Sequence, residues 1–310
     1  MNGAELISFL SRNLESIGSA VGHVAGALFT VIFLRYNTKT DEFEKIKAGK
    51  FREVADDLLE SGKMTYTEYY KVNNFLTIAK KADCYYQNHP RIDTGTIYDF
   101  DWFVRFYEAA GSVSDDTMQN LWAKILAGEI AQPSSFSLKT IDVLKNLSKK
   151  DAELFIKICS HSFVMNDSNY FLPHEDEYLK FAGIAYENIM KLNELGLMFN
   201  NGLISFKLNI SNTPQTLIVN HGLAMMIASS SGKPEIACMG HYPFTEVGKE
   251  LSTLISESAS DEDFLKYGEL LSHDKSFKIS VHKVIKREEN LIRFEKQDLI
   301  PVDISATNNE

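Results

Sequence analysis

The stretch NLWAKILAGEIAQPSSFSLKTIDVLKNLSKKDAELF, residues 120–155, shows most clearly how this chain folds. Its apolar side chains recur three and four residues apart, which is typical of helices with one buried face. Gly128 and Pro133 mark the end of the first segment, and Ser137 is a suitable N-cap for the next. The pattern predicts packed helices with an inward face formed by Leu121, Trp122, Ile125, Leu144 and Phe155.

The same helical period extends upstream of this stretch. Ser114 is expected to cap the helix that follows, because Asp115 and Asp116 then lie in its first turn, near the positive end of the helix dipole. The polar residues of that helix are expected on its solvent side: Gln119, Asn120 and Lys124. We therefore interpret this region as packing, and we look for function elsewhere.

The whole chain divides into three expected parts. Residues 1–50 form an apolar, glycine-rich leader and a charged connector, residues 51–160 a helical domain, and residues 161–310 a winged-helix-like α+β domain. The first of the two domains is expected to be helical almost throughout residues 52–160. The fold class is therefore α+β, mainly helical.

The winged-helix expectation comes from the order of helical and strand patterns after residue 170. Two short helical patterns end at Gly196, and an Asn-Gly turn then leads into a strand. Further patterns predict two helices at 244–255 and 261–272 and five strands at 215–220, 222–229, 235–240, 277–285 and 290–296. Helices followed by a β-hairpin wing are typical of a winged-helix module.

Composition limits the classes of function. The net charge of -10 weighs against general binding of nucleic acid. The three cysteines are far apart and form no CxxC pair, which fits reduced thiols in a cytoplasmic protein. The sequence contains no HExxH, GxGxxG, GxxxxGK[ST] or GxSxG motif. No catalytic residue and no cofactor is therefore expected.

Two groups of residues have side chains of the kinds that bind metal ions. The segment PHEDEY, residues 173–178, has a histidine and three acids, but adjacent side chains cannot all converge on one ion, and a solvated loop explains them better. His221, Cys238 and His241 lie near predicted strands, yet metal sites with such ligands show tighter spacing. No metal is expected.

The leader contains glycines at a regular spacing. Gly18, Gly22 and Gly26 recur every fourth residue and share one helix face, which lets two backbones approach closely. Residues 17–34 would span about 27 Å as a helix, near the lower limit for crossing a bilayer. His23 lies in the same apolar run, where a titratable group must face a partner or an interior. Two interpretations stay open: a segment attached to the inner membrane, and a buried hairpin or oligomer helix.

Several segments resemble a known family. They are DDTMQNLWAKILAGE, PSSFSLKTIDVLKNLSKKDAELF, the upstream VNNFLTIAKKA at 72–82, the turn LNELGL, and FTEVGKEL at 244–251. Together they resemble a family of bacterial proteins of unknown function, which is similar in turn to the abortive-infection alpha group associated with defence against bacteriophage. The resemblance implies a defence role but brings no catalytic residue.

Three functions are weighed on this basis. The first is a non-enzymatic phage-defence protein that binds a protein partner, forms a homo-oligomer and engages membrane through its leader. The alternative is a winged-helix DNA-binding regulator, although its candidate recognition helix YENIMKLNEL has Lys191 as its one cation, with Glu187 and Glu194 opposing phosphate. The third, an enzyme with an unfamiliar site, has no residue assigned to it.

Overall fold

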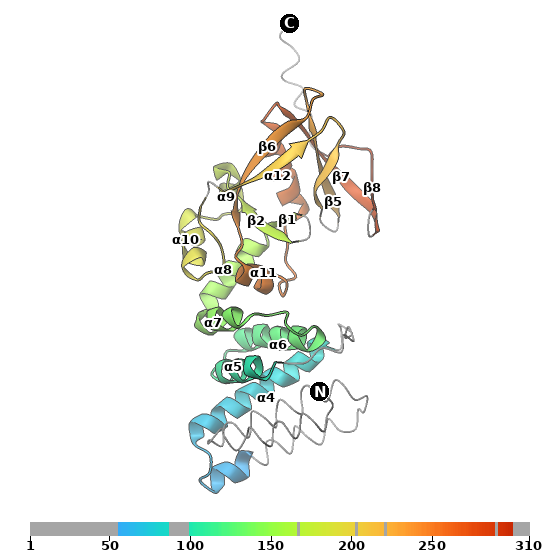
Figure 1. Ribbon diagram of the computed structural model, residues 1–310. Coiled ribbons are helices and arrows are strands. Elements are labelled where there is room, and N and C mark those ends of the chain that lie inside the picture. Colours follow the sequence, from blue (N-terminus) through green and yellow to red (C-terminus); the bar gives the residue numbers. More distant parts are fainter. Residues whose placement is uncertain are drawn as a thin grey trace. The chain divides into compact units, whose positions relative to one another are not determined.

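The computed structural model describes residues 55–86, 99–165, 168–201, 204–219, 222–288 and 291–299 (Figure 1). The chain divides into two compact units, Met1–Lys149 and Lys150–Glu310. Each unit has its own core, and each is described by itself below. The domain limits expected at residues 50 and 160 stay predictions.

The described part of the first unit is helical. A short helix at residues 55–60 precedes α4 (Tyr66–Tyr86), α5 (Phe100–Ala110), α6 (Asp116–Ala131) and α7 (Leu138–Asn146). Helix α4 packs along α6, and α5 contacts both α4 and α7. Unit one is thus a helical assembly held by the faces that the sequence pattern predicts.

Aromatic rings fill the core of this unit. Phe75 on α4 meets Phe103 on α5 edge to face, with ring centroids 5.7 Å apart. Phe106 meets Trp122 in the same way at 5.2 Å. Edge-to-face pairs of this kind add to the stabilisation that burial of the rings provides. The aromatic residues of α5 are therefore part of the packed core.

The burial expected for the opening stretch is confirmed at four of its five positions. Trp122, Ile125, Leu144 and Phe155 are buried. Leu121 was expected to be buried, but it is half-buried. It lies at the margin of the apolar face of α6, where the 100° rotation per residue carries a side chain partly toward solvent.

Two local expectations for α6 were wrong. The N-cap is Asp115 rather than Ser114, since the Asp115 side chain accepts the backbone N–H of Met118 at 3.0 Å. Gln119 is buried rather than solvent-facing, because its amide donates to the Val113 carbonyl at 2.9 Å and so has a partner inside. Ser137 caps α7 as expected and accepts from the Thr140 N–H.

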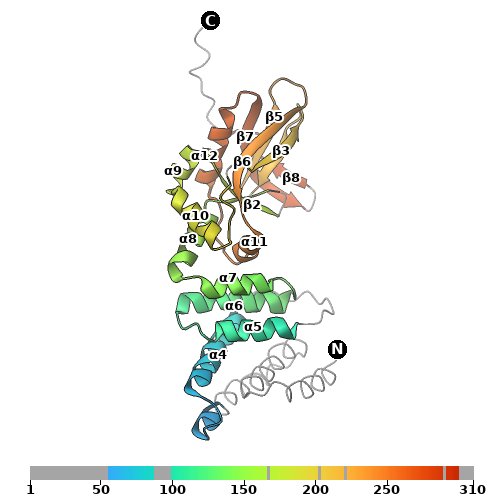
Figure 2. The same ribbon diagram turned by 60° about the vertical axis from the view of Figure 1, so that its left-hand side comes forward.

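The second unit begins with helices around a small sheet. Helix α8 (Lys149–Cys159) leads to strands β1 (Phe163–Met165) and β2 (Asn169–Pro173), followed by helices α9 (Asp176–Phe181) and α10 (Tyr186–Glu194). Strands β3 (Ser205–Ile210) and β6 (Glu235–Pro243) complete an antiparallel sheet in the order β1-β2-β6-β3. Helices α9 and α10 lie on the β2 and β6 side of the unit, far from β8, in both views (Figures 1 and 2).

A second antiparallel sheet follows the order β4-β5-β7-β8. Its strands are β4 (Gln215–Val219), β5 (Leu223–Ser229), β7 (Phe277–Glu288) and β8 (Leu291–Phe294). Every residue of the inner strand β5 is buried, and α12 (Asp261–Ser272) packs on β5 and β7. Helix α11 (Glu246–Ser252) precedes α12.

The α+β class expected from the sequence is confirmed, and the two sheets are antiparallel. The five predicted strands and the two late helices are also confirmed, with ends that shift by a few residues. Strands β1 and β2 were not predicted. They contain three and five residues, and runs that short carry little alternation of polar and apolar side chains.

Candidate functional site

The residues predicted to form an oligomer or membrane face lie outside the described residues. They are Gly18, Gly22, Gly26 and His23. Within the described part of the chain, none of the helices combines the length and the apolar character needed to cross a bilayer. The leader and its glycine face therefore stay predictions.

The candidate metal ligands that the structure describes do not form a metal site. His241 is buried, and its ring stacks on Phe206 with centroids 3.7 Å apart. Cys238 is exposed, and His221 lies outside the described residues. Among the residues that the structure describes, no three His, Cys, Asp or Glu side chains are placed to share one ion.

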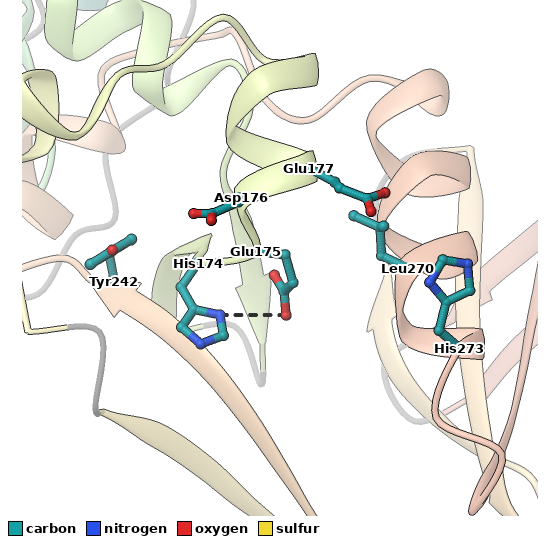
Figure 3. Close-up of a pocket in the computed structure, with 7 residues that line it drawn as sticks. All are labelled: His174, Glu175, Asp176, Glu177, Tyr242, Leu270 and His273. Carbon is teal, nitrogen blue, oxygen red and sulfur yellow. Dashed lines mark ion pairs between the residues drawn. The ribbon is translucent and has the colours of Figure 1, made fainter.

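The PHEDEY segment instead borders an open pocket of about 610 Å³ in the second unit (Figure 3). Four of its lining residues come from the β2–α9 connection and the start of α9. The other three come from β6 and from the end of α12. The lining residues are His174, Glu175, Asp176, Glu177, Tyr242, Leu270 and His273.

Glu175 and His174 lie beside one another in the lining of this pocket. Figure 3 shows their side chains facing one another, with His174 Nδ1 3.5 Å from Glu175 Oε1. Burial raises the pKa of the Glu175 carboxyl, and backbone hydrogen bonds and the neighbouring His174 offset part of that rise. The other oxygen, Glu175 Oε2, is buried and accepts no hydrogen bond from the described residues. His174 Nδ1 likewise has no hydrogen-bond partner among the described residues, so two unsatisfied polar atoms lie on neighbouring side chains here.

A glycine in β6 makes room for the histidine. The His174 ring lies so close to Gly240 that a Cβ at this position would overlap it. A sequence pattern cannot reveal this requirement, because Gly240 and His174 are brought together by the pairing of β2 with β6.

A second polar group lies beside the pocket and joins three helical segments. Asp263 on α12 is buried, and its Oδ1 is 2.7 Å from His161 Nδ1 after α8 and 2.9 Å from the Tyr178 hydroxyl on α9. Its Oδ2 accepts from the backbone and hydroxyl of Ser260 at 2.9 and 2.6 Å. Since every oxygen of Asp263 is engaged by the protein itself, we interpret this group as structural.

Neither arrangement resembles a nucleophilic centre. The seven lining residues of the pocket include no serine, cysteine or lysine. The serine in the second group contacts Asp263 rather than the histidine, so it lacks the base that would activate a hydroxyl. The acids in the lining can accept from a donor or pair with a positive charge.

Helix α10 and the segment after it carry exposed apolar side chains. Tyr186 is 51% exposed, Met190 36% and Phe199 47%. Tyr186 and Met190 are one helical turn apart, and the Asn200 side-chain nitrogen lies 2.9 Å from Met190 Sδ, which brings the segment after the helix to the same place. We call these three residues, Tyr186, Met190 and Phe199, the α10 surface. Sequence reasoning missed it, because exposure depends on what the rest of the fold leaves uncovered.

The α10 surface approaches the pocket at Tyr242. Burial raises the pKa of Tyr242, and the neighbouring Tyr186 and Asp176 raise it further. The Phe199 N–H donates to the carbonyl of Pro243, the residue after Tyr242, at 2.9 Å, so the α10 surface lies beside this end of β6. The pocket and the α10 surface are neighbouring parts of one unit.

Comparison with known families gives one match. Residues 63–268 match the model of a family described as a protein of unknown function (DUF2806), which is well over half of the chain. No curated protein and no solved structure matches the chain.

Proposed function

The chain belongs to the DUF2806 family of proteins of unknown function, and from that premise we propose that it is a non-enzymatic phage-defence protein that acts by binding a protein partner. The defence role is supported by the resemblance of residues 120–155 and the other quoted segments to proteins similar to the abortive-infection alpha group. We place the protein in the cytoplasm, with its leader as the element that self-associates or attaches to the inner membrane.

The first part of the second unit is proposed to be a winged-helix-like module. Helices α8, α9 and α10 precede the antiparallel pair β3 and β6, and β2 pairs with β6 to give the order β2-β6-β3. Helices followed by an antiparallel strand pair support this assignment, and this pair is not a hairpin, because β4 and β5 lie between β3 and β6 in the chain. In such a module α10 takes the place of the recognition helix, which in DNA-binding members enters the major groove.

One observation carries the proposal of protein binding: the solvent side of α10 is apolar and acidic rather than basic. Tyr186 and Met190 are exposed there beside Glu187 and Glu194. Lys191 is the cation of this helix, and its Nζ lies 3.8 Å from Asp151 on α8. A duplex-binding helix needs free cations and polar groups for phosphates and base edges, whereas exposed aromatic and methionine side chains favour protein interfaces.

The alternative function is a winged-helix DNA-binding regulator. The net charge of -10 and the acids of α10 argue against it. A gel-shift titration against random duplex separates the two functions. Nanomolar binding that weakens with salt would favour the regulator and overturn the proposal of protein binding.

The defence role is tested by plating bacteriophages on bacteria that express the full-length chain or carry an empty vector. We expect a reduced efficiency of plating for at least part of a diverse phage panel. The Met190→Glu variant should lose the protection, whereas Ile285→Glu, which changes an exposed isoleucine on β7, should keep it. Equal plating with and without the full-length chain across the panel would contradict the defence role.

Fractionation of cells that express the tagged full-length protein or a form lacking residues 1–50 tests the role of the leader. If the leader engages membrane, the full-length protein should sediment with the inner membrane and the truncated form should stay in the supernatant. Both forms in the supernatant would leave self-association as the role of the leader.

A further inference from the structure

We infer that the α10 surface and the adjacent pocket together form a docking site for a partner segment that carries apolar side chains next to a lysine or arginine. This inference rests on the proposed protein binding and names the chemistry of the partner. The apolar component follows from Tyr186, Met190 and Phe199, which are all at least one third exposed. Aromatic and methionine side chains are enriched at protein interfaces, and methionine adapts its shape to a partner.

The lysine or arginine of the partner segment is inferred from the charges around the α10 surface. Glu187 and Glu194 flank it on α10, and Glu175, Asp176 and Glu177 line the pocket. Two of the cations described nearby lie beside carboxylates: Lys191 next to Asp151, and Lys266 3.9 Å from Glu177 and 3.2 Å from Glu269. Lys157 donates to the Gly183 carbonyl, and Lys180 is exposed on α9. The surface is therefore complementary to a positively charged segment.

The pocket supplies a place for the charged group itself. Asp176 and Glu177 are exposed carboxylates in its lining, whereas Glu175 is half-buried beside His174. Lysine and arginine are donors with no acceptor, so either can pair with the exposed carboxylates. Tyr242 connects the charged end of the site to its apolar end, because its neighbour Pro243 accepts from the Phe199 N–H at 2.9 Å.

A second copy of the chain fits this site less well than a basic partner. A twofold contact through α10 would bring Glu187 and Glu194 of both copies together, and the chain as a whole has a net charge of -10. Acidic peptides, nucleic acid and anionic lipid would meet the same repulsion. The charge pattern therefore selects a basic and apolar segment of another protein.

Selection of peptides on the immobilised full-length protein tests this inference. A random 12-residue phage-display library, depleted on the Met190→Glu variant, should yield a consensus with lysine or arginine next to aromatic or aliphatic residues. A labelled synthetic peptide of that consensus should bind the wild type in a fluorescence anisotropy titration. Its Kd should rise by about tenfold or more for Met190→Glu and for Asp176→Asn.

Matched variants control for charge and for general damage. Ile285→Glu on β7 and Glu262→Gln on α12 change exposed residues of the same unit that do not belong to this site, and both should leave the Kd unchanged. Circular dichroism melts establish that Met190→Glu and Asp176→Asn are folded. Asp176→Asn also keeps the size of the side chain, so it stays informative if Met190→Glu proves unstable.

Three outcomes would overturn the inference: no consensus, an acidic consensus, or binding that neither variant changes. A further one is a wild-type dimer that Met190→Glu converts to a monomer in analytical ultracentrifugation, which would assign the surface to a second copy. Phage protection without peptide binding would reject this site and keep the defence role. Peptide binding without phage protection would keep this site and reject the defence role.

Discussion

Glu129 shows how one buried residue fixes a loop that the sequence pattern describes poorly. Its carboxylate accepts the backbone N–H groups of Ser134, Ser135 and Phe136 at 2.7, 3.1 and 3.2 Å. These bonds hold the turn between α6 and α7, where Ser134 has a φ of 69°. The carboxylate replaces water for three donors, so the turn can pack closely against α6.

Removing this acceptor should be costly. We expect Glu129→Ala to lower the free energy of unfolding by about 3 kcal/mol, because the N–H groups it served are left without a partner. Urea unfolding followed by circular dichroism measures the change. Glu108→Ala removes an exposed glutamate from α5 and should change stability by less than about 0.5 kcal/mol. Equal effects of the two variants would contradict the role given to Glu129.

The surroundings of Asp263 predict that the stability of the protein depends on pH. Burial would raise the pKa of its carboxyl, but hydrogen bonds from His161, Ser260 and Tyr178 outweigh burial and hold the pKa below its ordinary value. A group whose pKa is depressed on folding stabilises the protein above its unfolded pKa of about 3.9 and loses that contribution as pH falls through the folded pKa.

We therefore expect Asp263→Asn to be less stable than the wild type by about 2 kcal/mol at pH 7. The difference should shrink as the pH is lowered below about 4, because the wild type then loses the ionised carboxylate. Urea titrations at pH 7, 5 and 3 provide the measurement, with exposed Glu262→Gln on the same helix as the control. A difference that stays constant with pH would show that the charge of Asp263 is not what stabilises the unit.

At the scale of elements, α11 depends on a close backbone approach. The Cα of Gly248 lies so near the Leu197 carbonyl that a Cβ would overlap that oxygen. Thr245 caps the same helix and its hydroxyl donates to the Gly196 carbonyl at 2.6 Å. Helix α11 is thus attached to the turn that ends α10, where Gly196 has a φ of 74°.

Gly248→Ala should destabilise the second unit, although alanine is the better helix former by about 1 kcal/mol. The new methyl group meets backbone, which cannot rotate away as a side chain can. Thermal unfolding measures the effect, and Gly222→Ala, where a Cβ would make an ordinary contact of 3.6 Å, is the control. A rise in Tm for Gly248→Ala would mean that helix propensity dominates and that the contact yields easily.

For the whole molecule, the leader is predicted to control assembly. Each glycine in a helix costs about 1 kcal/mol relative to alanine, and a close helix–helix contact along Gly18, Gly22 and Gly26 would offset that cost. We expect Gly22→Leu to weaken self-association and to leave the described units folded. Sedimentation of wild type and variant in buffer and in mild detergent is the measurement. The same oligomer for both proteins in both media would mean that the glycine spacing is incidental.

The sequence by itself determined the elements whose side chains repeat. The apolar period of residues 120–155 predicted the buried faces of α6, α7 and α8, and Ser137 predicted the cap of α7. The alternation after residue 215 predicted five strands, because side chains on a strand point to opposite faces in turn. The family was also recognisable from quoted segments of the sequence, since residues 63–268 match it.

Only the tertiary structure decided which residues meet across the chain. His174 and Tyr242 line one pocket because β2 pairs with β6, and His273 joins them from the end of α12. Asp263 and His161 are about a hundred positions apart, and no local period connects them. The exposure of Tyr186, Met190 and Phe199 likewise depends on what the fold leaves uncovered. A repeating pattern of apolar side chains predicts the helix or strand in which they lie. A site depends on contacts between distant parts of the chain, and these form only when the chain folds.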